Sequence, residues 1–295
     1  MVSQFRNIGL IGRVDSEPVR DSVRALVEFL DSRAATVILE EETSRVIASH
    51  NLQVATRKLI GEVCDLVIVV GGDGSLLGAA RDLARHDVPV LGINRGRLGF
   101  LTDIAPDDIE TGVSLVLDGR FDTERRFLLE TQVTRGGGPV ATSDALNDVV
   151  LHSGQAPKML QFELYIEGQF VYSQNSDGLI VSTPTGSTAY SLSGGGPIMH
   201  PRLNAIVLVP MFPHTLSSRP LVIDGNSEIK IIVGESNRAT PSVSCDGQVT
   251  MGVKPDDVIY IRKKPHKLTL IHPEGHEFYQ TCRDKLGWGT QLFGE

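Results

Sequence analysis

Short apolar runs alternate with amphipathic stretches over the first hundred or so residues. The amphipathic stretches carry apolar residues at helical spacing, and the apolar runs have the length of buried strands. Strands that alternate with helices in this way build a parallel sheet, and ligands bind beyond the carboxyl ends of its strands. The pattern therefore predicts an α/β domain over residues 1–125. Strands are expected at 8–11, 36–39, 66–70 and 88–93, and helices at 22–33 and 75–86.

From about residue 125 the period changes to short runs rich in β-branched and aromatic residues. Turn sequences separate several of them: Glu167-Gly168, Asp224-Gly225-Asn226 and Asp246-Gly247. These signals predict a predominantly β domain over residues 126–272, followed by a C-terminal segment, 273–295, that packs back on the first domain. The strands are expected at 127–134, 161–166, 169–172, 179–182, 206–209, 228–233, 243–245, 258–262 and 268–271, and an amphipathic tail at 278–286.

The composition is that of an ordinary globular protein, with 41% apolar and 22% charged residues among 295. A formal net charge of −8 disfavours nucleic acid and anionic membrane surfaces as main partners. The sequence has no apolar stretch of about 18 residues and no signal-peptide pattern at its start, which predicts a cytoplasmic location. Cys64, Cys245 and Cys282 have no paired spacing and are expected to be reduced thiols, and the eight histidines show no metal-binding spacing.

The sequence Gly71-Gly72-Asp73-Gly74-Ser75 lies between the predicted strand 66–70 and the following helix. Glycines let backbone N–H groups converge on an anion, and the helix adds its N-terminal donors, so this loop is a candidate phosphate site. A carboxylate beside phosphate oxygens is unfavourable unless it takes a proton or holds a cation. Asp73 is thus a candidate general base or metal ligand, with a plain tight turn as the alternative. The loop matches neither a P-loop nor the dinucleotide-binding glycine pattern.

A second loop, residues 92–101, follows the next strand and stands at the same sheet edge. Arg95 and Arg97 lie in it among glycines and are candidates to neutralise phosphates, with solvated surface arginines as the alternative. Phe100 either stacks on a ring or fills the core. A third segment, residues 175–197, is dense in small hydroxyl residues and glycines, which suit close contacts to a planar polar ligand, with a plain connection between strands as the alternative.

Together these segments resemble bacterial NAD kinases. The resemblance rests on Gly-Gly-Asp-Gly at 71–74, the pattern at 92–101, Asn147-Asp148, and residues 177–191 with Thr-Pro-Thr-Gly-Ser-Thr-Ala-Tyr-Ser, in that order along most of the chain. The first motif alone also resembles loops of diacylglycerol kinases, sphingosine kinases and phosphofructokinases. The long motif at residues 177–191 is specific to the NAD kinase family pattern.

The resemblance implies transfer of the γ-phosphoryl group of ATP to the adenosine ribose 2′-hydroxyl of NAD, giving NADP, with a divalent cation, Mg²⁺, accompanying ATP. It implies a Rossmann-like α/β domain and a β-sandwich-like domain with the active site in the cleft between them, and a homodimer or homotetramer. Asp73 would be the catalytic base. The phosphate-binding residues would be Gly71, Gly72, Gly74 and Arg95. The residues for NAD would be Gly74, Phe100, Asn147, Asp148, Lys158, Asn175, Asp177, Thr188, Ala189, Tyr190, Ser191, Leu192, Ser193 and Gln248.

One position departs from the family pattern. The family usually has Glu where this chain has Asp148, whose carboxylate is one methylene shorter. Two other interpretations stay open at this level. A lipid kinase would share the Gly-Gly-Asp-Gly loop but would need a lipid interface. A non-catalytic NAD(P) sensor would keep the binding residues without forming product.

Overall fold

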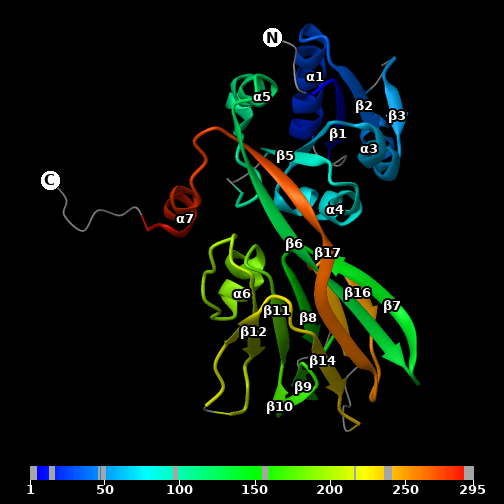
Figure 1. The fold of residues 1–295 in the computed structure, drawn as a ribbon, viewed down its shortest axis with the longest axis vertical. Helices are drawn as coiled ribbons and strands as arrows, with labels where there is room; N and C mark the ends of the chain where they lie inside the picture. The colour runs from blue at the N-terminus through cyan, green and yellow to red at the C-terminus, as the bar shows by residue number, and fades with distance from the viewer. Residues whose placement is uncertain are drawn as a thin grey trace, which may run out of the picture. The chain divides into compact units, whose positions relative to one another are not determined.

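The computed structural model describes residues 5–12, 17–45, 47, 51–95, 99–154, 159–215, 217–235 and 241–288. The chain divides into two compact units (Figure 1). Unit 1 comprises residues 1–125 and 268–295, and unit 2 comprises residues 126–267. Two long strands, β6 (Phe121–Arg135) and β17 (Val258–Pro273), contribute residues to both units.

Unit 1 is built on a parallel sheet, as predicted. Its strand order is β17-β5-β4-β1-β2-β3, and every pairing in it is parallel. The central strand β4 is buried along its whole length because helices cover both faces of such a sheet. The strands are β1 (Asn7–Gly12), β2 (Thr36–Glu40), β3 (Gln53–Ala55), β4 (Leu66–Gly71) and β5 (Pro89–Asn94).

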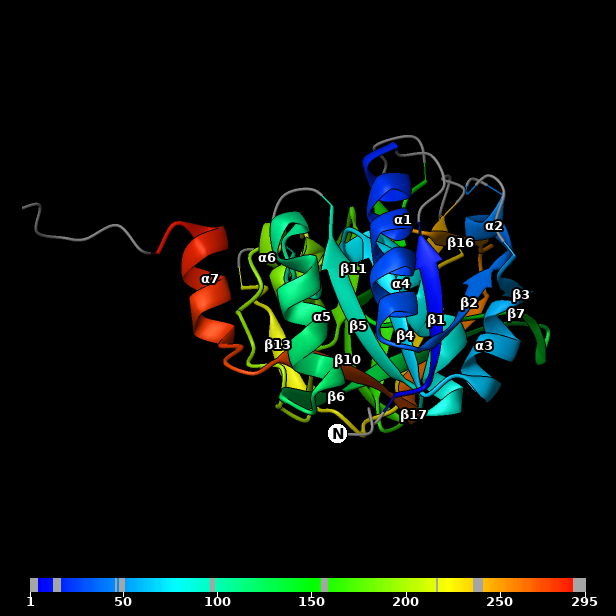
Figure 2. The ribbon, with the colours of Figure 1, turned by 90° about the horizontal axis from the view of Figure 1, so that it is seen from above.

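The helices of unit 1 follow the predicted amphipathic stretches where these are long. α1 (Glu17–Ser32) begins five residues before its predicted start. It lies beside α5 (Ile109–Leu117) on the sheet (Figure 2), and residues of both helices belong to one core. α4 (Asp73–Leu83) continues as a 3-10 turn to His86. The remaining helices are α2 (Glu41–Ser44), α3 (Arg57–Val63), the 3-10 turn Pro106–Asp108 and α7 (Phe278–Leu286).

Unit 2 is a sandwich of two antiparallel layers. One layer has the order β13-β12-β11-β8-β15-β16, and the other joins β10, β9, β14, β17, β6 and β7. Phe162 and Leu164 of the second layer share a core with Leu151 and Val181 of the first. The elements are β7 (Gly138–Ala145), β8 (Asp148–His152), β9 (Leu160–Ile166), β10 (Gln169–Ser176), β11 (Gly178–Ser182), β12 (Ala205–Met211), β13 (Leu221–Asp224), β14 (Ile229–Val233), β15 (Ser242–Cys245), β16 (Val249–Gly252), the 3-10 turn Gly186–Thr188 and α6 (Tyr190–Ser193).

Two predicted turns take the backbone conformation that tight hairpins need. Glu167 and Gly168 join β9 to β10 with φ values of 50° and 73°, and Asp246 and Gly247 lie between β15 and β16 with φ values of 53° and 64°. Positive φ at both central residues matches the right-handed twist of the flanking strands. The turns fix the register of each hairpin and place the Asp246 side chain at the end of β15.

All three cysteines are free and buried, in agreement with the predicted reduced thiols. Burial, and then the nearby charge of Asp65, raise the pKa of the Cys64 thiol to about 12, so this thiol is inert in the folded protein. Within the described ranges, no helix has the length and apolar character required to cross a membrane.

Candidate active site

The glycine-rich loop of unit 1 places Asp73 in the first turn of α4. Gly72 is the N-cap residue, and the Asp73 carboxylate accepts hydrogen bonds from three groups at the end of the second loop and directly after it. The backbone N–H groups of Phe100 and Leu101 donate at 2.8 and 3.1 Å, and the Thr102 hydroxyl donates at 3.2 Å. The helix N-terminus adds a favourable dipole for the negative charge. One carboxylate therefore joins the two loops that the sequence analysis singled out.

Two glycines in these loops stand where neighbouring atoms approach the backbone too closely for a side chain. A Cβ atom at Gly99 would lie 2.0 Å from Asp73 Oδ1 and 2.3 Å from Thr102 Oγ1. A Cβ at Gly71 would lie 2.3 Å from the Ser75 hydroxyl. The backbone N–H of Arg95 donates to the Gly71 carbonyl at 3.0 Å, which ties the start of the second loop to the first. Gly99 therefore leaves no room for a side chain beside the Asp73 carboxylate, and Gly71 leaves none beside Ser75.

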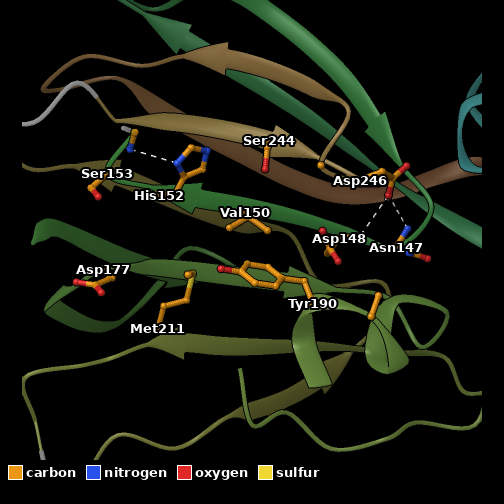
Figure 3. Close-up of a pocket in the computed structure, with 13 residues that line it drawn as sticks. Asn147, Asp148, Val150, His152, Ser153, Asp177, Tyr190, Met211, Ser244 and Asp246 are labelled. Carbon is orange, nitrogen blue, oxygen red and sulfur yellow. Dashed lines mark hydrogen bonds between the residues drawn. The ribbon is translucent and has the colours of Figure 1, made fainter. Parts of the chain in front are cut away.

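A cavity of about 530 Å³ lies in unit 2 on the face of the six-stranded layer opposite to the core. The alternation of β8 dictates which side chains reach it, because residues two apart share a face of a strand. Asp148, Val150 and His152 line the cavity, whereas Val149 and Leu151 belong to the core (Figure 3). The other lining residues are Asn147, Ser153, Gly154, Asp177, Ala189, Tyr190, Met211, Ser244, Asp246 and Gly247.

The Asp246 carboxylate holds the start of β8 against this cavity. Its oxygens accept hydrogen bonds from the backbone N–H groups of Asn147 at 2.7 Å (Figure 3) and Leu146 at 3.1 Å. The Asp246 N–H donates to the Asp148 carbonyl at 2.9 Å. Asp148 is only 4% exposed. Burial, and then the charge of Asp246, raise the pKa of the Asp148 carboxyl to about 7. Asp148 therefore offers a proton donor as well as acceptors near neutral pH.

Tyr190 lies between this cavity and a second one of about 540 Å³ in the same unit. Tyr190 is 47% exposed, so part of this residue is open to the two cavities. Met211 also borders both cavities, whereas Ser193 borders only the second. Such a wall of one tyrosine and small residues suits a planar ring with polar edges.

The structure brings the predicted residues together in two groups. Unit 1 gathers Gly71, Gly72, Asp73, Gly74, Arg95 and Phe100, and the unit 2 cavity gathers Asn147, Asp148, Asp177, Ala189 and Tyr190. Thr188, Ser191 and Leu192 lie in the adjoining turn and helix. Asn175 and Gln248 are exposed and line neither cavity. Arg97 and Lys158 lie outside the described residues.

Several lining residues were missed from the sequence. His152 is not among the residues predicted from the sequence, but it borders the cavity while its Nδ1 accepts a hydrogen bond from the Gly154 N–H at 3.1 Å. Burial lowers the pKa of His152, which favours its neutral form. Asp246 and Gly247 had been recognised only as a turn. The alternation of β8 was the signal that would have included His152, because it shares a face with Asp148.

A parallel α/β unit with a glycine-rich loop around a carboxylate, together with a polar cavity lined by small residues, is typical of enzymes that act on nucleotides. Family models agree with this class over most of the chain. Residues 8–121 match the ATP-NAD kinase N-terminal domain, and residues 146–273 match the ATP-NAD kinase C-terminal domain. The chain belongs to the NAD kinase family.

Relatives and solved structures agree with the family models. NAD kinase from Marinobacter nauticus is 61% identical over 291 residues and NAD kinase from Pseudomonas putida is 62% identical over 293, each alignment covering 99% of both chains. The structure is similar to yeast NADH kinase complexed with NADH, with a TM-score of 0.88, 25% identity, and coverage of 98% of this chain and 90% of that one. It is also similar to an NAD kinase from Archaeoglobus fulgidus in complex with ATP, with a TM-score of 0.72, 26% identity, and coverage of 95% and 97%.

The family relation fixes the class of activity. The protein is a transferase, a nucleotide-binding kinase that converts NAD to NADP. Membership of this family decides against the two alternatives that the sequence left open, a lipid kinase and a non-catalytic NAD(P) sensor.

Proposed function

We propose that Asp73 is the general base for phosphorylation of the adenosine ribose 2′-hydroxyl of NAD by ATP. The ribose oxygen forms a bond to the γ-phosphorus, the bond from that phosphorus to the bridging oxygen breaks to release ADP, and the hydroxyl proton passes to the Asp73 carboxylate. The observation that supports this role is the fixed carboxylate, which three donors hold between two glycine-rich loops. A carboxylate has about four acceptor positions, so one remains for the substrate hydroxyl.

The phosphates would contact the first loop and its neighbour. Gly71 and Gly72 leave the backbone open, Gly74 lies in the first turn of α4, and Arg95 follows β5 at the same sheet edge. A cradle of backbone donors at a helix N-terminus attracts phosphate, and a guanidinium adds charge. Phe100 would border the ribose, because its own N–H group is bonded to the proposed base.

The unit 2 cavity would hold the adenosine part of NAD. Asn147, Asp148 and Asp177 supply polar contacts to ribose and base, and Ala189 and Tyr190 supply apolar walls. The protonated carboxyl of Asp148 would donate to a ring nitrogen and its other oxygen would accept from an amino group, so the shorter side chain retains both functions. The remaining predicted contacts are Lys158, Asn175, Thr188, Ser191, Leu192, Ser193 and Gln248.

A divalent cation, expected to be Mg²⁺, would be bound mainly through ATP. Mg²⁺ prefers oxygen ligands and usually takes one or two carboxylates together with substrate phosphates and water. Asp73 is the carboxylate at the first loop, and three donors already occupy most of its acceptor positions. Asp73 and the loop around it fit a cation that is bound mainly by phosphate oxygens. The cation would neutralise the negative charge of the phosphates during phosphoryl transfer. We further propose a homodimer or homotetramer in the cytoplasm.

The proposal is tested by product identity. Purified protein is incubated with NAD, ATP and Mg²⁺, and the product is supplied to a dehydrogenase that accepts only NADP. One NADP is expected for each ADP released. A phosphorylated product that this dehydrogenase does not use would place the phosphoryl group on another hydroxyl and overturn the assignment. Replacing ATP with polyphosphate in the same assay tests whether polyphosphate also serves as phosphoryl donor.

A further inference from the structure

A second cluster of metal-ligand side chains lies in unit 1, apart from the phosphate loop. Asp103 follows the loop that holds Asp73, His272 lies near the end of β17, and His276 precedes α7. Each offers one ligand atom, and the three atoms lie within 4.8 Å of one another. We propose that Asp103, His272 and His276 bind a divalent transition-metal ion of the Zn²⁺ type, which would fasten the C-terminal segment to the loop after Asp73.

The geometry around Asp103 calls for a positive charge between these groups. One carboxylate oxygen, Oδ2, is in contact with Nδ1 of His272 and lies 3.3 Å from Nδ1 of His276. A nitrogen lone pair that faces a carboxylate oxygen is repelled unless a proton or a metal ion lies between them. Two ligands of a tetrahedral zinc ion with bonds of about 2.1 Å lie about 3.4 Å apart, which is close to the distance from Asp103 to His276. The direct contact between Asp103 and His272 is closer than this, so it must lengthen when the ion enters.

An independent feature is the carboxylate on the far side of the His272 ring. Glu124 Oε2 lies 3.6 Å from Nε2 of His272. Histidines that bind metals through one nitrogen almost always present the other N–H to a carboxylate, carbonyl or water. With an ion bound to Nδ1, the proton of His272 would stay on Nε2 and face Glu124. The His272 side chain is 1% exposed, so the ring has a fixed orientation.

The site has room for the ion and its remaining ligand. His276 and Asp103 border a cavity of about 340 Å³ that is also lined by Glu274, Glu277 and Asp284, whose negative charges attract a cation. The rings of His272 and His276 are stacked, 4.1 Å apart with planes at 15°. Binding therefore requires the largely buried His276 ring to tilt out of the stack while its Nδ1 stays near Asp103. Two imidazoles and one carboxylate favour Zn²⁺, Co²⁺ or Ni²⁺ over Mg²⁺, which prefers oxygen ligands only.

Metal binding is measured on the full chain without a polyhistidine tag, after chelator treatment and in millimolar Mg²⁺. Zn²⁺ is titrated against a chromophoric chelator, and Co²⁺ reports ligand geometry by its visible absorption. One equivalent of Zn²⁺ is expected, and Zn²⁺ should raise the unfolding temperature. His276→Gln and Asp103→Asn should each weaken binding by more than about 100-fold, and Glu124→Gln by about 10–100-fold. His266→Gln, at an exposed position of β17, is the matched control and should bind like the parent.

The alternative occupant is a proton shared among the same side chains. Absence of stoichiometric Zn²⁺ binding, or binding that His276→Gln and Asp103→Asn leave unchanged, would overturn the proposal in favour of that proton. The variant Glu124→Gln keeps the ligands themselves, so a graded loss in this variant supports the site even where a ligand variant folds poorly. The readout is metal binding rather than NADP formation, so the result does not depend on the role of Asp73.

Discussion

Replacing Gly99 with alanine should disable the enzyme by displacing the proposed base. The backbone at Gly99 has no positive φ, so alanine is compatible with its conformation. The added Cβ, however, would lie 2.0 Å from Asp73 Oδ1, and real Cβ atoms do not approach other atoms closer than 3.0 Å. The carboxylate or the loop must therefore move by about 1 Å. A misplacement of that size at a reacting group can cost about 100-fold in rate.

The expected result for Gly99→Ala is a kcat about 100-fold below wild type and a free energy of unfolding lowered by about 1–3 kcal/mol, the usual cost of overpacking. Turnover is measured at saturating NAD and ATP, and stability by urea unfolding. Gly252→Ala is the control, because a Cβ there meets nothing within 4 Å. A kcat for Gly99→Ala within about threefold of the control would refute the reasoning that the position of the Asp73 carboxylate limits catalysis.

Three further predictions follow from unit 2 and from the buried thiol. Gly186→Ala should raise the KM for NAD with a smaller effect on kcat, because its Cβ would lie 2.2 Å from the Asn147 carbonyl oxygen at the cavity; steady-state kinetics with an unchanged KM would count against that cavity as the NAD site. The pKa of Asp148 is raised from 3.8 to about 7, so the folded protein binds the extra proton between these values and this carboxyl's contribution to stability falls as pH rises through that window. The free energy of unfolding of Asp148→Asn, measured with urea, should therefore increase relative to that of wild type as pH rises from 5 to 8. A difference between the two proteins that does not change with pH would contradict the raised pKa of Asp148. Cys64, with a pKa of about 12, should react with alkylating reagents at pH 8 only after unfolding, which mass spectrometry detects; rapid labelling of the folded protein would show that it is accessible.

Local periodicity predicted the parallel sheet of unit 1 and most strands of unit 2, because long apolar runs and tight turns are local signals. It missed elements whose patterns are ambiguous. β7 is rich in small and polar residues and largely lacks an apolar face, and α5 carries β-branched residues that mask its helical spacing. β3 has only three residues. Their formation depends on the pairing and packing that the rest of the fold provides.

The candidate site was predicted in part for the same reason. The glycine-rich loop around Asp73 is a local motif, and so is the segment that carries Tyr190. Contacts between distant segments have no local signal. The bond from the Leu146 N–H to Asp246 spans 100 residues, and the contact from Asp103 to His272 spans 169. Neither the anchoring role of Asp246 nor the Asp103 cluster was therefore visible before the fold was known.

The central claim is that Asp73 accepts the proton and does not merely hold the loop. The most direct test compares Asp73→Asn with Thr102→Val, which removes one hydrogen bond to Asp73 and leaves the carboxylate intact. With folding and NAD binding retained, Asp73→Asn should lower kcat by about 10²–10⁴-fold, and Thr102→Val should stay within about tenfold of wild type. Equal losses in the two variants, or near-normal turnover of Asp73→Asn, would contradict the assignment of Asp73 as the base.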